Sequence, residues 1–145
     1  MFFQFVFAIV LLLDQFTKLL ALQFLNETGS IPVIPKVFYL TLVYNPGVAF
    51  GIFRHHPAVL FVVVTISLIF LFLWGSRKAD LIGLQRLGLA MILGGAVGNW
   101  IDRARFGAVI DFLDFRVWPV FNIADSAITI GVSIFVILIL RKKPQ

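Results

Sequence analysis

Two aspartates, Asp102 and Asp125, lie near the ends of apolar segments, and each follows an asparagine by three residues (Asn99 and Asn122). The chain is 61% hydrophobic. A carboxylate at membrane depth costs roughly 2.5–3.5 kcal/mol on insertion scales. Aspartates kept at that cost either carry function or form a specific internal pair, so these two are the first candidates for chemistry.

Two carboxylates that share a water-accessible site can hydrolyse a bond, because one activates water as a general base while the other donates a proton. We expect Asp125 in the first turn of a helix, where the dipole favours the carboxylate, and Asp102 at a helix end, where it favours the acid. Arg103 beside Asp102 opposes the second trend. The structural alternative is that Asp125 or Asn122 caps a helix and that Asp102 pairs with Arg103.

The two asparagines are open to the same two interpretations. Each asparagine comes three residues before its aspartate, so within a helix the two side chains share one face. Asn99 and Asn122 are therefore placed to orient the carboxylates or to donate to an oxyanion. Hydrogen bonding between helices is an equally good explanation. Asp14 and Lys18 are spaced four residues apart in the first apolar segment, which favours an intrahelical ion pair with a structural role.

Composition places the chain among membrane proteins. The mean hydropathy is +1.03, and only 13% of the residues are charged. The net charge of +5 therefore indicates anchoring to lipid headgroups rather than nucleic-acid binding. The absence of cysteine excludes disulfides and thiol chemistry. The adjacent His55 and His56 do not have the spacing of a helical zinc site, and no nucleotide-binding loop is present.

Four segments are long enough to span a bilayer, because 20 helical residues cover about 30 Å. They are residues 2–25, 57–74, 81–101 and 120–140. Residues 1–13 carry no basic side chain, and the first apolar run continues to Leu25, so we expect a retained helix rather than a cleaved signal peptide. Glycines at 88, 94, 95 and 98 predict a close packing face on the third segment.

The segments between the spans predict a small sheet. Residues 26–56 contain glycine and proline punctuation around 37–44, a stretch of β-branched and aromatic residues that is typical of a strand. Residues 103–119 form a second extramembrane segment. The predicted fold is a polytopic α-helical membrane protein, a single membrane-embedded domain over 1–145, with four transmembrane helices and a small extracytoplasmic β-sheet on the membrane surface.

Four spans place both termini on one side of the membrane, and the distribution of basic residues predicts which side. The short link at 75–80 and the C-terminal tail are dense in basic residues, whereas the opposite side mixes basic with acidic ones. The positive-inside rule therefore favours cytoplasmic termini and a site that faces outside. The basic residues on the terminal side are Arg77, Lys78, Arg86, Arg141, Lys142 and Lys143, and those opposite are Lys36, Arg54, Arg103, Arg105 and Arg116.

Five short motifs in order along the chain resemble the lipoprotein signal peptidases (signal peptidase II), aspartic proteases of the bacterial cytoplasmic membrane. The motifs are Asp14–Lys18, Asn45–Phe50, Gly98–Arg103, Val109–Phe112 and Phe121–Asp125. The resemblance implies that Asp102 and Asp125 are the catalytic pair. It also implies substrate-binding or orienting roles for Asn45, Asn99, Arg103 and Asn122, with Asp14 and Lys18 as a polar pair on the first helix.

The resemblance also implies the reaction. The expected substrate is a prolipoprotein whose cysteine carries diacylglycerol, cut on the amino side of that cysteine. No metal or other cofactor and no nucleic acid is implied, globomycin-type inhibitors are expected to bind, and we expect a monomer in the inner membrane. One departure is that the N-terminus is short and lacks a leading basic residue.

Two other classes compete with a peptidase. A proton-coupled transporter also uses membrane carboxylates, but it predicts polar residues through the full membrane depth and often an internal repeat. Neither is found here: the second and fourth spans lack a polar file. A scaffolding membrane protein gives no reason for two Asn-x-x-Asp strings at one level. The sequence therefore favours the peptidase.

Overall fold

The computed structural model describes residues 1–47, 56–77 and 83–141. Several features of the sequence analysis lie outside these residues: the end of the Asn45–Phe50 motif, Arg54, His55, Lys78, the start of the predicted third span, Lys142 and Lys143. The elements are α1 (Phe2–Leu25), β1 (Ser30–Ile34), β2 (Phe38–Asn45), α2 (Pro57–Arg77), α3 (Leu84–Phe106), β3 (Val109–Asp114) and α4 (Ile123–Arg141).

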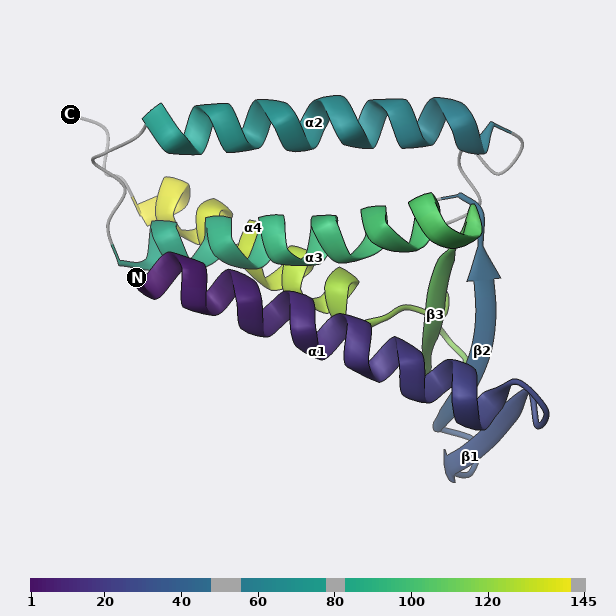
Figure 1. The fold of residues 1–145 in the computed structure, drawn as a ribbon. Coiled ribbons are helices and arrows are strands. Elements are labelled where there is room, and N and C mark those ends of the chain that lie inside the picture. Colours follow the sequence, from purple (N-terminus) through teal and green to yellow (C-terminus); the bar gives the residue numbers. More distant parts are fainter. Residues whose placement is uncertain (48–55, 78–82, 142–145) are drawn as a thin grey trace.

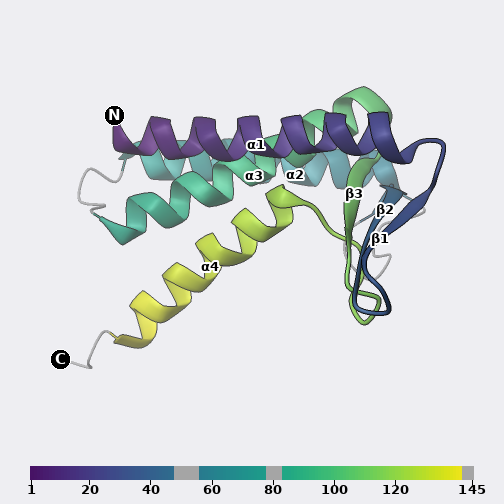
Figure 2. The same ribbon diagram turned by 90° about the horizontal axis from the view of Figure 1, so that it is seen from below.

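The four helices run side by side, and the three strands gather at one end of them (Figure 1). The start of α1 and the end of α4 both lie at the opposite end. Helix α3 is central, because it contacts each of the other three helices and also β3. Figure 2 shows α4 diverging from the other helices towards its C-terminal end. Four long helices and a small sheet confirm the predicted fold class.

Helix α3 packs closely through its glycines, as predicted. A Cβ added at Gly94 would lie 3.0 Å from the backbone oxygen of Phe7 in α1, and one at Gly95 would lie 2.5 Å from the backbone oxygen of Ala124 in α4. A Cβ at Gly98 would collide with the carboxylate of Asp14. Backbones approach this closely only where side chains are absent, so the glycines bring α1 and α4 onto α3.

Among the described residues, three helices combine the length and apolar composition needed to cross a membrane: Phe2–Leu25, Ala58–Gly75 and Ile123–Arg141. Helix α3 has 23 residues but is less apolar than these three, because it carries buried polar side chains. It also runs five residues beyond the predicted end at 101 and stops where Gly107 adopts a left-handed φ of 70°. Glycine favours that conformation, which ends the helix.

The sheet is antiparallel, in the order β1-β2-β3. Strand β2 agrees with the strand predicted at 37–44, whereas β3 was not predicted within 103–119. The register pairs Asn45 of β2 with Val109 of β3, at the end of the sheet next to α3. Phe112 of β3 packs with Ala21 and Leu25 of α1 in a buried apolar cluster. This cluster holds the sheet against the helices and so sets the position of β3.

Candidate active site

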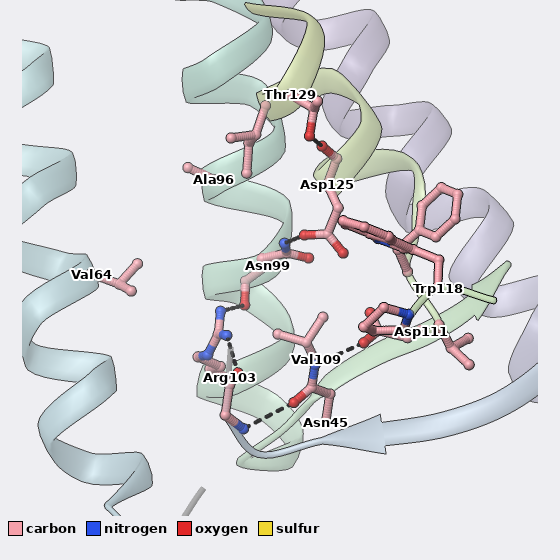
Figure 3. A pocket seen from close by; sticks show the side chains of 15 residues that line it. Asn45, Val64, Ala96, Asn99, Arg103, Val109, Asp111, Trp118, Asp125 and Thr129 are labelled. Carbon is pink, nitrogen blue, oxygen red and sulfur yellow. Dashed lines mark hydrogen bonds between the residues drawn. The ribbon is translucent and has the colours of Figure 1, made fainter. Parts of the chain in front are cut away.

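A pocket of about 380 Å³ lies between α2, α3, β3 and the start of α4 (Figure 3). Its polar side chains come from four different elements, whereas its walls are mainly apolar. The polar or charged lining residues are Asn45, Asn99, Arg103, Asp111, Asp125 and Thr129, and the other lining residues are Gly47, Val64, Ala96, Val109, Trp118, Pro119, Val120, Phe121 and Ile128. Two carboxylates therefore face one pocket, and they belong to Asp111 and Asp125.

Asp125 lies in the first turn of α4 and is held by a reciprocal cap. The side-chain oxygen of Asn122 accepts the Asp125 backbone N–H at 2.8 Å, and Oδ2 of Asp125 accepts the Asn122 backbone N–H at 3.3 Å. This arrangement is that of a capping box. The other oxygen, Oδ1, accepts a hydrogen bond from Nδ2 of Asn99 at 2.8 Å. These donors hold the Asp125 carboxylate in one orientation at the N-terminus of α4.

Asp111 lies on β3 and is only 1% exposed, although it borders the pocket. Its Oδ1 accepts a hydrogen bond from Nδ2 of Asn122 at 2.7 Å, and its Oδ2 accepts one from Nδ2 of Asn45 at 2.9 Å. Burial raises the pKa of Asp111 to about 7, and the negative charge of Asp125 adds to the rise. Asp111 is thus a carboxyl group that holds a proton near neutral pH.

The three asparagine amides around the carboxylates have only one orientation that satisfies their partners. The oxygen of Asn45 accepts the backbone N–H of Gly47, and the oxygen of Asn122 accepts a backbone N–H of α4. The oxygen of Asn99 accepts a hydrogen bond from Nζ of Lys18 at 2.8 Å. Each NH₂ group is therefore directed at a carboxylate, which is the geometry that an orienting residue needs.

Arg103 places its guanidinium on the same side of α3 as Asn99 (Figure 3). Its Nη2 donates to the backbone oxygen of Gly47 at 2.9 Å, which ties α3 to the end of β2. Its Nε is buried and has no hydrogen-bond partner among the described residues. Arg103 therefore brings a positive charge and a spare donor to the border of the pocket.

Asp102 does not line this pocket, although the sequence analysis expects it to act together with Asp125. Asp102 is 1% exposed, and its Oδ2 forms an ion pair with Lys18 at 2.7 Å. The same oxygen accepts the backbone N–H of Ile110 at 3.1 Å, and Oδ1 accepts a hydrogen bond from Gln15 at 3.1 Å. Both oxygens of Asp102 thus accept hydrogen bonds or an ion pair from within the protein, away from the pocket.

The predicted ion pair between Asp14 and Lys18 is present, with 2.8 Å between Oδ2 and Nζ. Both side chains are buried, at 0% and 2% exposure. Lys18 reaches Asp102 as well, so the pairing of Asp102 with Arg103, which was the structural alternative, is replaced by pairing with a lysine from another helix. Neither Asp14 nor Lys18 lines the pocket.

The main residue that the sequence analysis missed is Asp111. The signal was available, because Asp111 stands inside the Val109–Phe112 motif. Its neighbours on β3 are apolar and buried, and a carboxylate in such a strand is costly. What the motif alone did not indicate is that β3 runs alongside the start of α4, where Asn122 links Asp111 to Asp125.

The arrangement is suited to hydrolysis in an apolar setting. One carboxyl group is protonated near pH 7, the other lies at a helix N-terminus, and amide donors orient both. Two carboxyl groups that border one pocket can supply an acid and a base. The apolar walls suit a substrate that carries hydrocarbon.

The known proteins that resemble this chain belong to one family. The family described as signal peptidase (SPase) II matches residues 6–141. The lipoprotein signal peptidase of Halothermothrix orenii is 44% identical over 137 residues, which cover 93% of this chain and 92% of that protein. The lipoprotein signal peptidase of Pelotomaculum thermopropionicum is 48% identical over 136 residues, 90% of this chain and 86% of that protein.

A solved structure described as that of a bacterial membrane enzyme has the same fold. Its TM-score is 0.84 at 32% sequence identity, over 97% of this chain and 94% of the other. This likeness and the apolar helices make the chain a multi-pass membrane protein. The sequence match, the fold and the paired carboxylates lead to one conclusion: the chain belongs to the signal peptidase II family of peptidases.

Proposed function

We propose that Asp111 and Asp125 are the acid and the base with which this chain hydrolyses a peptide bond. The observation that carries the proposal is that these two carboxylates border one pocket and are linked through Asn122. Asp125 retains the catalytic role expected from the sequence, and Asp111 takes the role first given to Asp102. The two groups titrate as a pair, so their apparent pKa values belong to both.

The proposed reaction is a direct attack by water. Asp125 takes a proton from the water molecule while the water oxygen attacks the scissile carbonyl carbon. At the same time Asp111 gives its own proton to the carbonyl oxygen. In the second step Asp125 gives the proton it took from water to the leaving nitrogen, Asp111 recovers a proton from a hydroxyl of the tetrahedral intermediate, and the C–N bond breaks. The products are a carboxylate on the signal peptide and a free amine on the mature protein. Arg103 supplies positive charge beside the developing oxyanion.

Members of the signal peptidase II family remove the signal peptide from prolipoproteins, and this chain does the same. The finer proposal is that the substrate cysteine carries diacylglycerol and that the bond cut lies on its amino side. The apolar walls support this, because Val64, Ala96 and Ile128 border the pocket on three different helices. Acyl chains can then remain in hydrocarbon while the peptide meets the carboxylates.

The remaining polar residues have orienting roles in this proposal. Asn45 and Asn122 hold Asp111, and Asn99 holds Asp125. Arg103 additionally joins α3 to Gly47. Each amide oxygen is already occupied, so the amides keep their NH₂ groups on the carboxylates throughout the reaction.

The proposal places the enzyme in the bacterial inner membrane with both termini in the cytoplasm and the pocket outside. The support is the basic character of the terminal end, where Arg77, Arg86 and Arg141 lie. At the sheet end Asp114 pairs with Arg116 and so offsets part of the basic charge there. We further propose that the enzyme acts as a monomer and that globomycin-type cyclic peptides occupy the pocket as inhibitors.

A pH profile tests the acid–base assignment. The pH dependence of kcat/KM reports the free enzyme, and the pKa of Asp111 is about 7. We expect kcat/KM to fall as pH rises through about 7, because Asp111 loses the proton that it must donate. A profile that stays level to pH 9 contradicts the assignment.

Matched substrates test the lipid requirement. A prolipoprotein with a diacylglyceryl cysteine is compared with the same protein without the lipid, using purified enzyme in detergent. We expect cleavage of the lipidated form and little or no cleavage of the other. Equal cleavage of the two contradicts the proposed substrate class but leaves the catalytic pair untouched. Addition of globomycin to the same assay tests its binding.

A further inference from the structure

Three charged side chains are buried beside the pocket without lining it: Asp14, Lys18 and Asp102, at 0%, 2% and 1% exposure. Two come from α1, which contributes no residue to the pocket lining. Replacing buried ion pairs by apolar side chains is often neutral or stabilising. Stability alone therefore gives no reason to keep three charges here.

Lys18 is the centre of this group. Its Nζ lies 2.8 Å from Oδ2 of Asp14, 2.7 Å from Oδ2 of Asp102 and 2.8 Å from Oδ1 of Asn99. An ammonium has three N–H donors, so each has a partner. The contact with Asn99 leads directly to the pocket, because Nδ2 of Asn99 donates to Asp125.

Besides Lys18, the carboxylates of Asp14 and Asp102 each accept a hydrogen bond from a backbone N–H group. Oδ1 of Asp14 accepts the backbone N–H of Ala124 at 2.9 Å, and Oδ2 of Asp102 accepts the backbone N–H of Ile110 at 3.1 Å. Ala124 directly precedes Asp125, and Ile110 directly precedes Asp111. The residue before each pocket carboxylate thus donates its backbone N–H to a carboxylate that is ion-paired with Lys18.

We propose that Asp14, Lys18 and Asp102 form a buried clamp that sets the relative position of Asp111 and Asp125. One cation holds two carboxylates, and each carboxylate holds the chain immediately before one member of the catalytic pair. The clamp residues are positioning residues, since none of them contacts the pocket. The inference rests on the proposed function, because it assumes that Asp111 and Asp125 do the chemistry.

The two carboxylates of the clamp allow a sharp comparison, because their oxygens are used differently. In Asp14 one oxygen serves Ala124 and the other serves Lys18, so in Asp14→Asn the amide must lose one of the two. In Asp102 a single oxygen serves both Ile110 and Lys18, so in Asp102→Asn the amide oxygen can keep both, and only the hydrogen bond from Gln15 is lost. Asp14→Asn is expected to do more damage than Asp102→Asn.

The first experiment measures kcat and KM for a lipidated prolipoprotein with folded variants in detergent. We expect Asp14→Asn to lower kcat by roughly 100-fold, the cost of misplacing catalytic groups by about 1 Å, with KM within about twofold of wild type. Asp102→Asn is expected to lower kcat by about tenfold or less. The matched control is Asp114→Asn, a buried carboxylate on β3 whose partners are Thr41 and Arg116, and it is expected to stay within about threefold.

A pH profile distinguishes two explanations for a lower kcat, a misplaced catalytic pair and a partly unfolded sample. Partial unfolding lowers kcat without moving the pKa of the folded enzyme. The charges that act on Asp111 are Asp125 on α4, which raises its pKa, and Lys18 on α1, which lowers it. Arg103 on α3 interacts with Asp111 as well. When Asp14→Asn frees the start of α4, Asp125 moves away and its repulsion of the Asp111 carboxylate weakens. The pKa of Asp111 then falls, so the alkaline limb of kcat/KM is expected to move to lower pH. An unmoved limb contradicts the clamp.

A second variant tests Lys18 itself. Lys18→Met alone leaves two buried carboxylates unpaired, whereas Lys18→Met with Asp14→Asn and Asp102→Asn leaves no charge in the clamp. We expect this triple variant to keep a cooperative thermal transition in detergent and to lose roughly 100-fold in kcat or more.

The reference for both experiments is Asp111→Asn. If Asp111→Asn is inactive while the folded triple variant and Asp14→Asn cleave as wild type does, the clamp is wrong and the catalytic pair stands. If Asp111→Asn itself cleaves normally, the proposed function fails first.

Discussion

Replacing Gly95 by alanine is predicted to misplace Asp125 without touching it. The added Cβ would lie 2.5 Å from the backbone oxygen of Ala124, whereas ordinary van der Waals contact begins at 3.4 Å. Backbone cannot rotate away as a side-chain tip can, so the start of α4 must move from α3 by about 1 Å. Asp125 follows Ala124 directly, and its 2.8 Å hydrogen bond from Asn99 would stretch beyond hydrogen-bonding distance.

The expected cost follows from that displacement. A misplacement of about 1 Å in a catalytic group lowers the rate roughly 100-fold, which corresponds to about 2.7 kcal/mol in the activation free energy. Overpacking of this kind also costs about 1–3 kcal/mol in the free energy of unfolding. The assay is kcat for a lipidated prolipoprotein, together with thermal unfolding in detergent to confirm that the variant is folded.

The matched control is Gly75→Ala. There the new Cβ would lie 2.7 Å from Cδ2 of Leu89, the flexible end of a side chain that can rotate away. We expect kcat within about twofold of wild type, because the α2–α3 contact adjusts without moving a catalytic group. If Gly95→Ala retains wild-type kcat, or if both alanine variants lose activity equally, the argument from the α3–α4 contact is refuted.

Two further predictions concern pH dependence and membrane orientation. Asn45→Ala removes a hydrogen bond that lowers the pKa of Asp111, so the alkaline limb of kcat/KM is expected to move to higher pH; a limb that stays in place or moves down contradicts the role of Asn45. The chain has no cysteine, so Val117→Cys, at a position 91% exposed beside the sheet, gives a single label site. We expect a membrane-impermeant maleimide to label it in intact spheroplasts and to label Leu140→Cys only after lysis, and the reverse pattern would invert the proposed orientation.

The helices were predictable because their signals are local. An apolar run long enough for the bilayer marks α1, α2 and α4, and the spacing of Gly88, Gly94, Gly95 and Gly98 marks the packing face of α3. Errors arose at the ends, where local chemistry overrides hydropathy. Helix α3 continues through its charged last turn to the glycine cap at Gly107.

The site was harder to predict because it depends on contacts between distant parts of the chain. Asp125 and its capping asparagine are close in sequence, and their relation was recognised. Which of Asp102 and Asp111 borders the pocket with Asp125 depends on Lys18, which comes from the first helix and forms an ion pair with Asp102. It also depends on β3, whose pairing with distant β2 carries no local periodicity. Two aspartates nine positions apart in sequence thus have different surroundings, one beside Lys18 and the other at the pocket.

We propose that Asp111, together with Asp125, performs the hydrolysis and that Asp102 does not. The most direct test is cleavage of a diacylglyceryl-modified prolipoprotein by Asp111→Asn, Asp125→Asn and Asp102→Asn, each shown to be folded. We predict that the first two lose about 1,000-fold or more in kcat, within the range of acid–base catalysis, and that Asp102→Asn loses about tenfold or less. Wild-type cleavage by Asp111→Asn, or a loss in Asp102→Asn as large as that in Asp125→Asn, would contradict this assignment.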